Sequence, residues 1–353
     1  MNIRSYRGTY GVSFTSMSEL IEKVSHIENA YTIIDKNIYN MYKKDLNCLL
    51  EDNYYVLEAT ETNKTLDVAK TIIDKIVLLD SRKETKIVAI GGGITQDLSC
   101  FVSSIIYRGV KWYLIPTTLL AQTDSCIGSK SSINMTPYKN LLGTFYPPTE
   151  IFLCTDFLRS LPEKEYYSGL GEIIKCSLLS GQERFTEFAN NLGRVLNRDY
   201  DRLKEEINKT LIYKRELIEA DEFDMGIRNI LNYGHTFGHA IESASEYKVP
   251  HGQAVSIGIL IANNVSLGRG LISKEYNDSI AESVRRILSA DLISDETFDL
   301  SKIISNMKKD KKYNKHHNCI LLGPAGADKY PVSETEISDS LLRTRDVLCN
   351  LTQ

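Results

Sequence analysis

The sequence lacks the features that mark several large classes of protein. No apolar run approaches the ~18 residues of a membrane-spanning helix, and the start, MNIRSYRGTYGVSF, carries no apolar signal core. The seven cysteines are dispersed without a CxxC pair, which favours reduced thiols over a disulfide framework. A net charge of -4 gives no broad cationic surface for nucleic acid. We therefore expect a cytoplasmic protein with neither a membrane nor a nucleic-acid partner.

The first 160 residues alternate between strand-like and helix-like segments. The chain has 353 residues, of which 42% are hydrophobic, so two domains with substantial cores are possible. Strands alternating with helices predict a parallel sheet covered on both faces. The expected strands are AYTIID at 30–35, KIVAIG ahead of the glycines, KWYLIP at 111–116 and EIFLC at 150–154, with helices from 66 and from 94.

From about residue 161 the pattern changes and strand-like runs become rare. We expect a nucleotide-binding α/β domain at 1–160, a mainly α-helical domain at 161–353, and an active cleft between them. The expected helices of the second domain are 163–180, 200–220, 228–246 and 252–270.

Three of the six histidines lie within 17 residues: His235, His239 and His251. The first two are four apart and would share a helix face, and with Arg228 and Asn232 they would form one polar stripe. Imidazoles so placed suit a divalent metal, with a carboxylate supplied from elsewhere. A hydrogen-bonded histidine is the common alternative, and HxxxH lacks the glutamate of the HExxH metalloprotease signature.

Glu172 and Lys175 lie one turn apart in the otherwise apolar text SGLGEIIKCSLL. A surface ion pair is the default interpretation of such a pair. Within a nearly apolar helix, however, two charges are costly to bury unless they are paired or used. Glu172 is therefore the natural third ligand beside His235 and His251.

The segment GGGITQD follows a strand and opens a helix, the context of a phosphate-binding turn. A tight turn without a ligand is the alternative, since the segment is not GxGxxG; Asp97 could cap or line the site. Polar residues follow in the sequence, among neighbours with short side chains that would let a ligand approach closely. This pattern suggests recognition of a small anion, although a solvated loop would also carry such residues. They are Arg108, Thr117, Thr118, Asp124, Lys130, Lys139 and Asn140.

Together these segments resemble the 3-dehydroquinate synthase branch of the sugar phosphate cyclases. The resemblance runs from about residue 30 to about 325 and rests on GGGITQDL, YRGVKWYLIPTTLLAQTDSCIGSK, KNLLGTFYPP, SGLGEIIK, RNILNYGHTFGHAIE and HGQAV. It implies an N-terminal nucleotide-binding α/β domain, a helical C-terminal domain with the metal between them, and a homodimer.

The resemblance also implies roles for individual residues. The ligands of Zn2+ (or Co2+) would be Glu172, His235 and His251. The NAD contacts would be Asp35, Asn37, Glu61, Lys64, Gly92, Gly93, Asp97, Thr117, Thr118 and Lys139. The substrate contacts would be Asp124, Lys130, Asn140, Lys175, Lys214, Arg228, Asn232 and His239, with Arg108 reaching a phosphate across the dimer and Lys311 or Lys312 also facing the phosphate.

The implied reaction is the conversion of 3-deoxy-D-arabino-heptulosonate 7-phosphate to 3-dehydroquinate and phosphate, a lyase step of the shikimate pathway and aromatic amino acid biosynthesis. NAD+ would transiently oxidise the C5 hydroxyl, whose pKa the metal lowers. Phosphate would then leave by elimination, the hydride would return, and an intramolecular aldol step would close the ring. Arg228 and Lys214 match the positions that hold a substrate carboxylate, which favours this substrate over neutral sugar phosphates.

Several departures from the family pattern bear on the substrate. The usual GGKT reads GSKS at 128–131, Gly-Lys-Asn reads YKN at 138–140, HGE reads HGQ, DExE ends in Asp224, and LLGPAGADK is atypical. A paralogous cyclase acting on another sugar phosphate, aminated or neutral, is therefore an alternative. A metal-dependent polyol dehydrogenase and a non-catalytic NAD-binding paralogue are alternatives of other classes.

Overall fold

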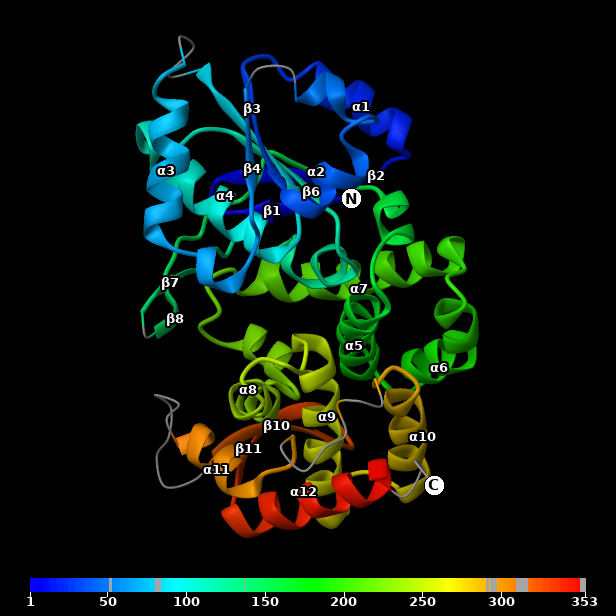
Figure 1. Cartoon of the computed structure of the whole chain (residues 1–353). Coiled ribbons are helices and arrows are strands. Elements are labelled where there is room, and N and C mark those ends of the chain that lie inside the picture. The colour runs from blue at the N-terminus through cyan, green and yellow to red at the C-terminus, as the bar shows by residue number, and fades with distance from the viewer. Residues whose placement is uncertain are drawn as a thin grey trace. The chain divides into compact units, whose positions relative to one another are not determined.

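The computed structural model describes residues 1–50, 53–79, 84–136, 138–289, 292, 297–308 and 317–349, which form two compact units (Figure 1). The first unit comprises Met1–Leu161 and Lys214–Asp224, and the second comprises Pro162–Tyr213 and Met225–Gln353. The sequence pattern groups 214–224 with the helical half, but this segment packs with the first unit. The assignment of nucleotide binding to one part and of metal binding to the other stays a prediction.

The first unit is built on a seven-stranded sheet. Only its first two strands pair antiparallel, and all other neighbours are parallel. The predicted parallel α/β fold is therefore confirmed, although the first two strands and β4 were not predicted. The order across the sheet is β1 (Asn2–Ser5), β2 (Gly8–Phe14), β9 (Glu150–Leu153), β6 (Trp112–Pro116), β5 (Lys86–Gly91), β3 (Ala30–Asp35) and β4 (Tyr54–Leu57).

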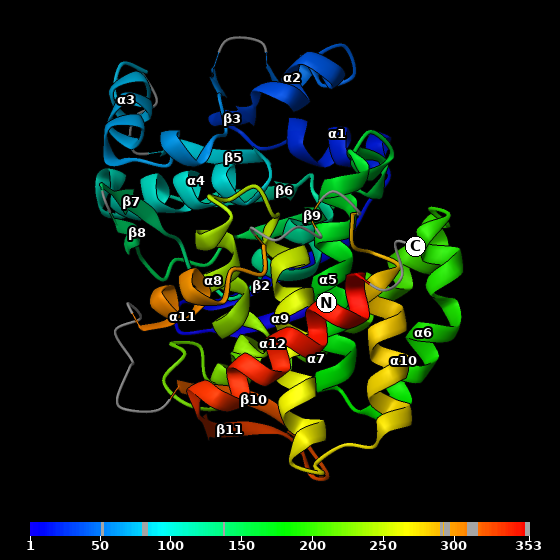
Figure 2. The ribbon, with the colours of Figure 1, turned by 60° about the horizontal axis from the view of Figure 1, so that its bottom comes forward.

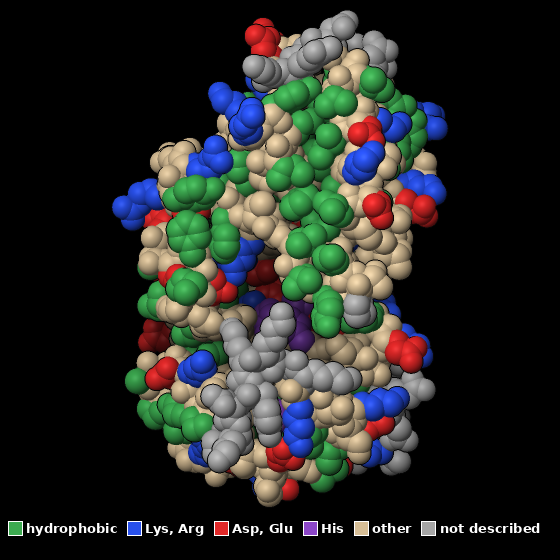
Figure 3. Space-filling view, turned by 90° about the vertical axis from the view of Figure 1, so that its left-hand side faces the viewer, with side chains coloured by type: hydrophobic (Ala, Val, Ile, Leu, Met, Phe, Trp, Pro, Cys, Tyr) green, Lys and Arg blue, Asp and Glu red, His purple; other side chains and the backbone are tan. Residues whose placement is uncertain are grey.

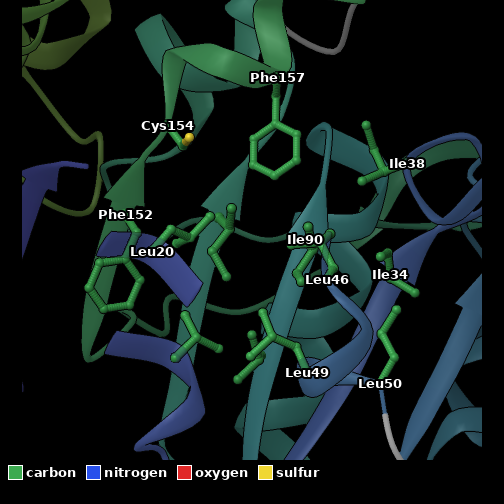
Figure 4. Close-up of a cluster of buried hydrophobic side chains, with 13 residues drawn as sticks. Leu20, Ile34, Ile38, Leu46, Leu49, Leu50, Ile90, Phe152, Cys154 and Phe157 are labelled. Carbon is green, nitrogen blue, oxygen red and sulfur yellow. The ribbon is translucent and has the colours of Figure 1, made fainter. Parts of the chain in front are cut away.

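Alternate side chains of the buried strands face opposite sides of this sheet, as a period of two requires. Ile34, Ile90 and Phe152 point to one face, where they join residues of α1 (Met17–Ser25) and α2 (Lys36–Tyr42) in one apolar cluster (Figure 4). The intervening residues are also buried, and α4 (Gly93–Ile105) packs against β3, β5 and β6 with α3 (Leu66–Ile76) beside it. Helices thus cover both faces.

A separate hairpin, β7 (Ile133–Met135) and β8 (Tyr138–Leu142), extends the first unit near α3 and α4. Hydrophobic side chains gather on the surface of these elements (Figure 3). Exposed members of this apolar face are Leu66, Ile105, Met135, Tyr138 and Leu141.

The second unit is mainly helical, as predicted (Figure 2). Its centre is α9 (His251–Gly268), which is buried from Gly252 to Ser266 and contacts α5, α8, α10, α12 and β10. The other elements are α5 (Glu163–Leu179), α6 (Gln182–Leu196), the part of α7 (Tyr200–Ala220) before Lys214, α8 (His235–Ala244), α10 (Lys274–Arg285), α11 (Leu300–Lys308), β10 (His317–Gly323), β11 (Gly326–Val332) and α12 (Glu334–Cys349). The β10–β11 hairpin was not predicted. Among the described residues, no helix is long and apolar enough to cross a membrane.

The prediction of one helix over 228–246 is wrong. A 3-10 helix, Ile227–Asn232, is followed by a break, and α8 begins at His235. Gly234 has φ +78, and a methyl group on it would lie 2.7 Å from the carbonyl oxygen of Val255 in α9. Close packing against α9 therefore ends the first segment. Arg228 and Asn232 consequently do not share a helical stripe with His235 and His239.

Candidate functional site

Three side chains of the second unit form a group that could hold a metal ion. Glu172 comes from α5, His235 is the first residue of α8, and His251 is the first residue of α9. Ligand atoms of all three lie within 4.8 Å of one another. The Nε2 atoms of His235 and His251 lie 3.9 and 3.6 Å from the same Glu172 oxygen, Oε1. Atoms bound about 2.0–2.1 Å from a tetrahedral Zn2+ would lie about 3.4 Å apart, so the spacing fits.

Both imidazoles also form a hydrogen bond through Nδ1, the ring nitrogen other than the Nε2 atom near Glu172. Nδ1 of His235 lies 3.2 Å from the Tyr233 carbonyl oxygen, and Nδ1 of His251 lies 3.3 Å from Glu242 Oε2. Burial lowers the pKa of His251, but the hydrogen bond and charge of Glu242 and the charge of Glu172 outweigh it, so the pKa is raised. Each ring therefore directs Nε2 toward Glu172.

The buried carboxylate of Glu172 calls for a cation. Its side chain is fully buried, and its Oε1 accepts no hydrogen bond from a described residue. Lys175, equally buried one turn later, forms an ion pair with Oε2. An acidic group so enclosed is costly unless its charge is fully balanced. One carboxylate and two imidazoles would leave the fourth position of a tetrahedral ion for another ligand, as at a catalytic zinc site.

Glycines next to the three candidate ligands allow their helices to touch. A methyl group on Gly171 would overlap the carbonyl oxygen of Gly252, and one on Gly252 would overlap that of Ser168. Gly234, which precedes His235, is packed against α9 in the same way. Backbone contact therefore sets the spacing of α5, α8 and α9 at the level of the ligands.

A polar pocket of about 110 Å³ lies beside His235 within the second unit. Asn232 and His239, both predicted substrate contacts, line it with His235. The sequence-based search missed the other polar lining residues, which come from the 3-10 helix, α8 and the β10–β11 hairpin. They are Asn229, Thr236, His317, Asn318 and Lys329.

In the first unit, predicted NAD residues follow neighbouring parallel strands. Asp35 ends β3, Gly92 and Gly93 follow β5, and Thr117 follows β6. Carboxyl ends of parallel strands meet at one edge of a sheet, where such folds bind nucleotides. A methyl group on Gly92 would lie 3.0 Å from the Thr118 side chain, so a larger residue would crowd the turn. The Asp35 carboxylate accepts from the backbone N–H groups of Asn37 and Ile38.

Lys64 organises several of these residues. Its Nζ lies 2.6 Å from Asp97 Oδ2, and it donates to Ser132 at 2.7 Å and to Asn140 at 2.8 Å. Burial raises the pKa of Asp97 more than Lys64 and Ser132 lower it. Asn140, a predicted substrate contact, thus joins the group predicted to bind NAD. A second ion pair joins Glu61 and Lys139 at 3.5 Å.

Three predicted substrate residues, Asp124, Lys130 and Lys214, form ion pairs that involve the segment 214–224, and a predicted phosphate residue, Arg108, lies in a strained turn. Lys214 Nζ lies 2.7 Å from Asp124 Oδ1, and Lys130 Nζ lies 2.6 Å from Asp224 Oδ2. Arg108 has φ +68, inside a short turn at the end of α4.

The remaining predicted residues are Arg228 and one lysine of the pair at 311–312. Arg228 is buried in the 3-10 helix of the second unit. Lys311 and Lys312 lie outside the described residues.

Comparison with protein families covers most of the chain. Residues 54–168 match the N-terminal domain model of 3-dehydroquinate synthase, and residues 169–313 match the C-terminal domain model. The chain belongs to the 3-dehydroquinate synthase family. The 3-dehydroquinate synthase of Thermoanaerobacter pseudethanolicus is 33% identical over 334 residues, which cover 92% of this chain and 93% of that protein. The protein is therefore an enzyme of the sugar phosphate cyclase family.

Solved structures share the fold of this 3-dehydroquinate synthase family member. A 2-deoxy-scyllo-inosose synthase, complexed with carbaglucose-6-phosphate, NAD+ and Co2+, superposes with a TM-score of 0.84 at 23% identity, covering 97% of this chain and 99% of that one. A 2-epi-5-epi-valiolone synthase from Streptomyces hygroscopicus subsp. jinggangensis 5008, with NAD+ and Zn2+ bound, gives 0.80 at 20% identity, covering 96% and 97%. Since the two are named for different products, the fold leaves the sugar phosphate open.

Proposed function

We propose that this chain is a cytoplasmic 3-dehydroquinate synthase, which cyclises 3-deoxy-D-arabino-heptulosonate 7-phosphate to 3-dehydroquinate and phosphate. The observation that carries the proposal is the convergence of Glu172, His235 and His251 in a chain of this family. The names of its sequence relatives support the substrate, and the NAD+ and metal of its structural neighbours support the cofactors.

In this proposal Glu172, His235 and His251 hold a divalent cation, Zn2+ or Co2+. When bound, the cation acidifies a substrate hydroxyl, and NAD+ accepts and returns one hydride. The fixed tautomers of the two histidines keep Nε2 available as a ligand. Lys175 balances the charge of Glu172, and its ammonium would orient a substrate hydroxyl beside that carboxylate.

The other residues bind and place the substrate and the nucleotide. Asn232 and His239 line the polar pocket beside His235 and would hold the phosphate end. Lys130, Lys311 or Lys312, and Arg108 from a second copy would add positive charge there. Arg228 and Lys214 would hold the carboxylate, since a guanidinium fork fits that group. Lys64 and Asp97 would contact NAD+.

A homodimer belongs to this proposal, because Arg108 would serve the partner's phosphate. The apolar face of α3, α4 and the β7–β8 hairpin supports association, since contiguous exposed apolar side chains mark protein interfaces (Figure 3).

A paralogous cyclase acting on another sugar phosphate is the second candidate, favoured by the low-identity likeness to two cyclases with other products. Phosphate release from a panel of acidic, aminated and neutral sugar phosphates decides between them. The proposal predicts release from the heptulosonate phosphate alone, without net NADH. Release only from a neutral or aminated sugar phosphate would assign the paralogue, and stoichiometric NADH without phosphate release would assign a polyol dehydrogenase.

A further inference from the structure

Two groups of potential metal ligands in the second unit share one residue. His251 belongs to the group with Glu172 and His235, and also to a group with His239 and Glu242. Each group has ligand atoms within 4.8 Å of one another. Each group contacts a different ring nitrogen of His251: Nε2 lies 3.6 Å from Glu172, and Nδ1 lies 3.3 Å from Glu242.

The contact at Nδ1 has hydrogen-bond geometry, with Glu242 Oε2 accepting from the ring N–H. A neutral imidazole carries one proton, so a hydrogen bond donated by Nδ1 leaves Nε2 as the lone-pair atom. The same nitrogen cannot donate this bond and ligate an ion. The carboxylate of Glu242 is largely buried, with 16% of its side chain exposed, which shields the bond from water. His239, the third member of the second group, is exposed.

The helices place Glu242 for this role. It follows His235 by seven residues on α8, so the two lie on one face of that helix, two turns apart. His251 opens α9, which packs closely against α8 through Gly238 and Gly258. Helix α8 thus supplies the candidate ligand His235 and, through Glu242, also holds the candidate ligand His251 of α9.

We propose that Glu242 is a positioning residue for the metal site: it fixes the tautomer and the ring orientation of His251, and the group with His239 is not a second metal site. This inference rests on the proposed metal site. Imidazole ligands commonly donate their second N–H to a carboxylate, and removal of that partner lowers metal affinity by about 10–100-fold.

The test is titration of the metal-free protein with Co2+, read by its visible absorption spectrum and by stoichiometry. Wild type should bind one ion per chain. Glu242→Ala should bind one ion about 10–100-fold more weakly with an altered spectrum, and Glu242→Gln, which keeps an acceptor oxygen, should fall between. His239→Ala should retain the wild-type affinity, stoichiometry and spectrum. Glu183→Ala, an exposed change on α6, is the matched control. Circular dichroism of each metal-free variant checks that it folds.

Each of the other outcomes would overturn the positioning role of Glu242, the exclusion of a second metal site or the proposed function. Two ions in wild type, falling to one in both Glu242→Ala and His239→Ala, would make the second group a cation site. An unchanged affinity and spectrum in Glu242→Ala would remove its positioning role while leaving the proposed function intact. Absence of Co2+ binding by folded wild type would overturn both the proposed function and this inference. If Glu242→Ala does not fold, Glu242→Gln alone must show the weaker binding, or the inference fails.

Discussion

Glu172 Oε1 lies 3.6 Å from His251 Nε2, although 79 residues separate the two in the sequence. The distance is too long for a hydrogen bond and suits two ligands of one ion. Backbone contact between α5 and α9 at Gly171 and Gly252 creates this proximity.

Glu172→Gln should abolish metal binding, because a site with three protein ligands has none to spare. The loss should exceed the ~10–100-fold typical of an orienting residue. Metal content after dialysis, measured by mass spectrometry, checks this. Glu183→Gln, the same change at an exposed position, should keep the metal. Full metal content in folded Glu172→Gln would show that this carboxylate is not a ligand.

Gly171→Ala should weaken metal binding without altering any ligand. Its methyl group would overlap the Gly252 carbonyl oxygen, so α5 and α9 must separate, at a cost of about 1–3 kcal/mol. Co2+ affinity and thermal unfolding measure the two effects. In contrast, the methyl group of Gly193→Ala in α6 would meet only the end of the Arg286 side chain. This variant should therefore leave Co2+ binding unchanged. Equal affinities for the two variants would contradict this role of the helix contact.

Lys64→Met should weaken NAD+ binding and leave metal content unchanged. It removes the charge partner of Asp97 and the donor to Ser132 and Asn140. Charge-assisted hydrogen bonds contribute ~1.5–3 kcal/mol, so Kd should rise about tenfold or more. Calorimetric titration with NAD+ measures this. Lys70→Met, which breaks the exposed pair with Asp74, is the control and should bind normally.

Arg228→Leu should raise KM for the heptulosonate phosphate at least about tenfold, through loss of a bidentate contact to the carboxylate. NAD+ affinity should stay at the wild-type value, because the predicted NAD residues lie in the other unit. Steady-state phosphate release gives KM. An unchanged KM in the folded variant would remove the carboxylate assignment, and with it the main residue-level support for this substrate.

Glu336→Gln should destabilise the protein near neutral pH, with a difference that disappears in acid. The hydrogen bond from Arg269 lowers the pKa of Glu336 from 4.5 to about 2. Partial burial raises this pKa, and hydrogen bonds from Ser333 lower it further. Because the folded pKa lies below the unfolded value, the stabilisation is complete above about pH 4.5 and is lost as the pH falls toward 2. Melting temperatures of both proteins at pH 7, 5 and 3.5 check this: the gap should narrow only at the lowest pH.

Local sequence patterns were sufficient to predict those strands and helices whose conformation depends mainly on their own residues. Short apolar runs predicted β3, β5, β6 and β9, and the helix-like pattern predicted α3, α5 and α9. Residue chemistry indicated the candidate metal ligands and many of the polar site residues, whereas the roles of those polar residues and the rest of the site came from the family resemblance.

Two of the misses, the break at Gly234 and the contact of Glu242, depend on a distant part of the chain. The break at Gly234 is imposed by α9, and nothing in the local pattern shows it. Strand β11 contains Asp328, Lys329 and Pro331 and is largely exposed, so it lacks the apolar alternation of a half-buried strand. Glu242, an acid on a helix, resembles a solvated residue until His251 is placed beside it.

The return of 214–224 to the first unit means that a fragment cut at residue 160 would be an incomplete body. It would lose Glu222, which accepts from Ser129 Oγ at 2.7 Å and from Tyr6 N–H at 2.8 Å. Ser129, held at φ +64, would lose its side-chain partner there, and the lysine that follows would lose Asp224. Separate study of the first unit therefore needs a fragment in which a grafted linker restores 214–224, rather than simple truncation.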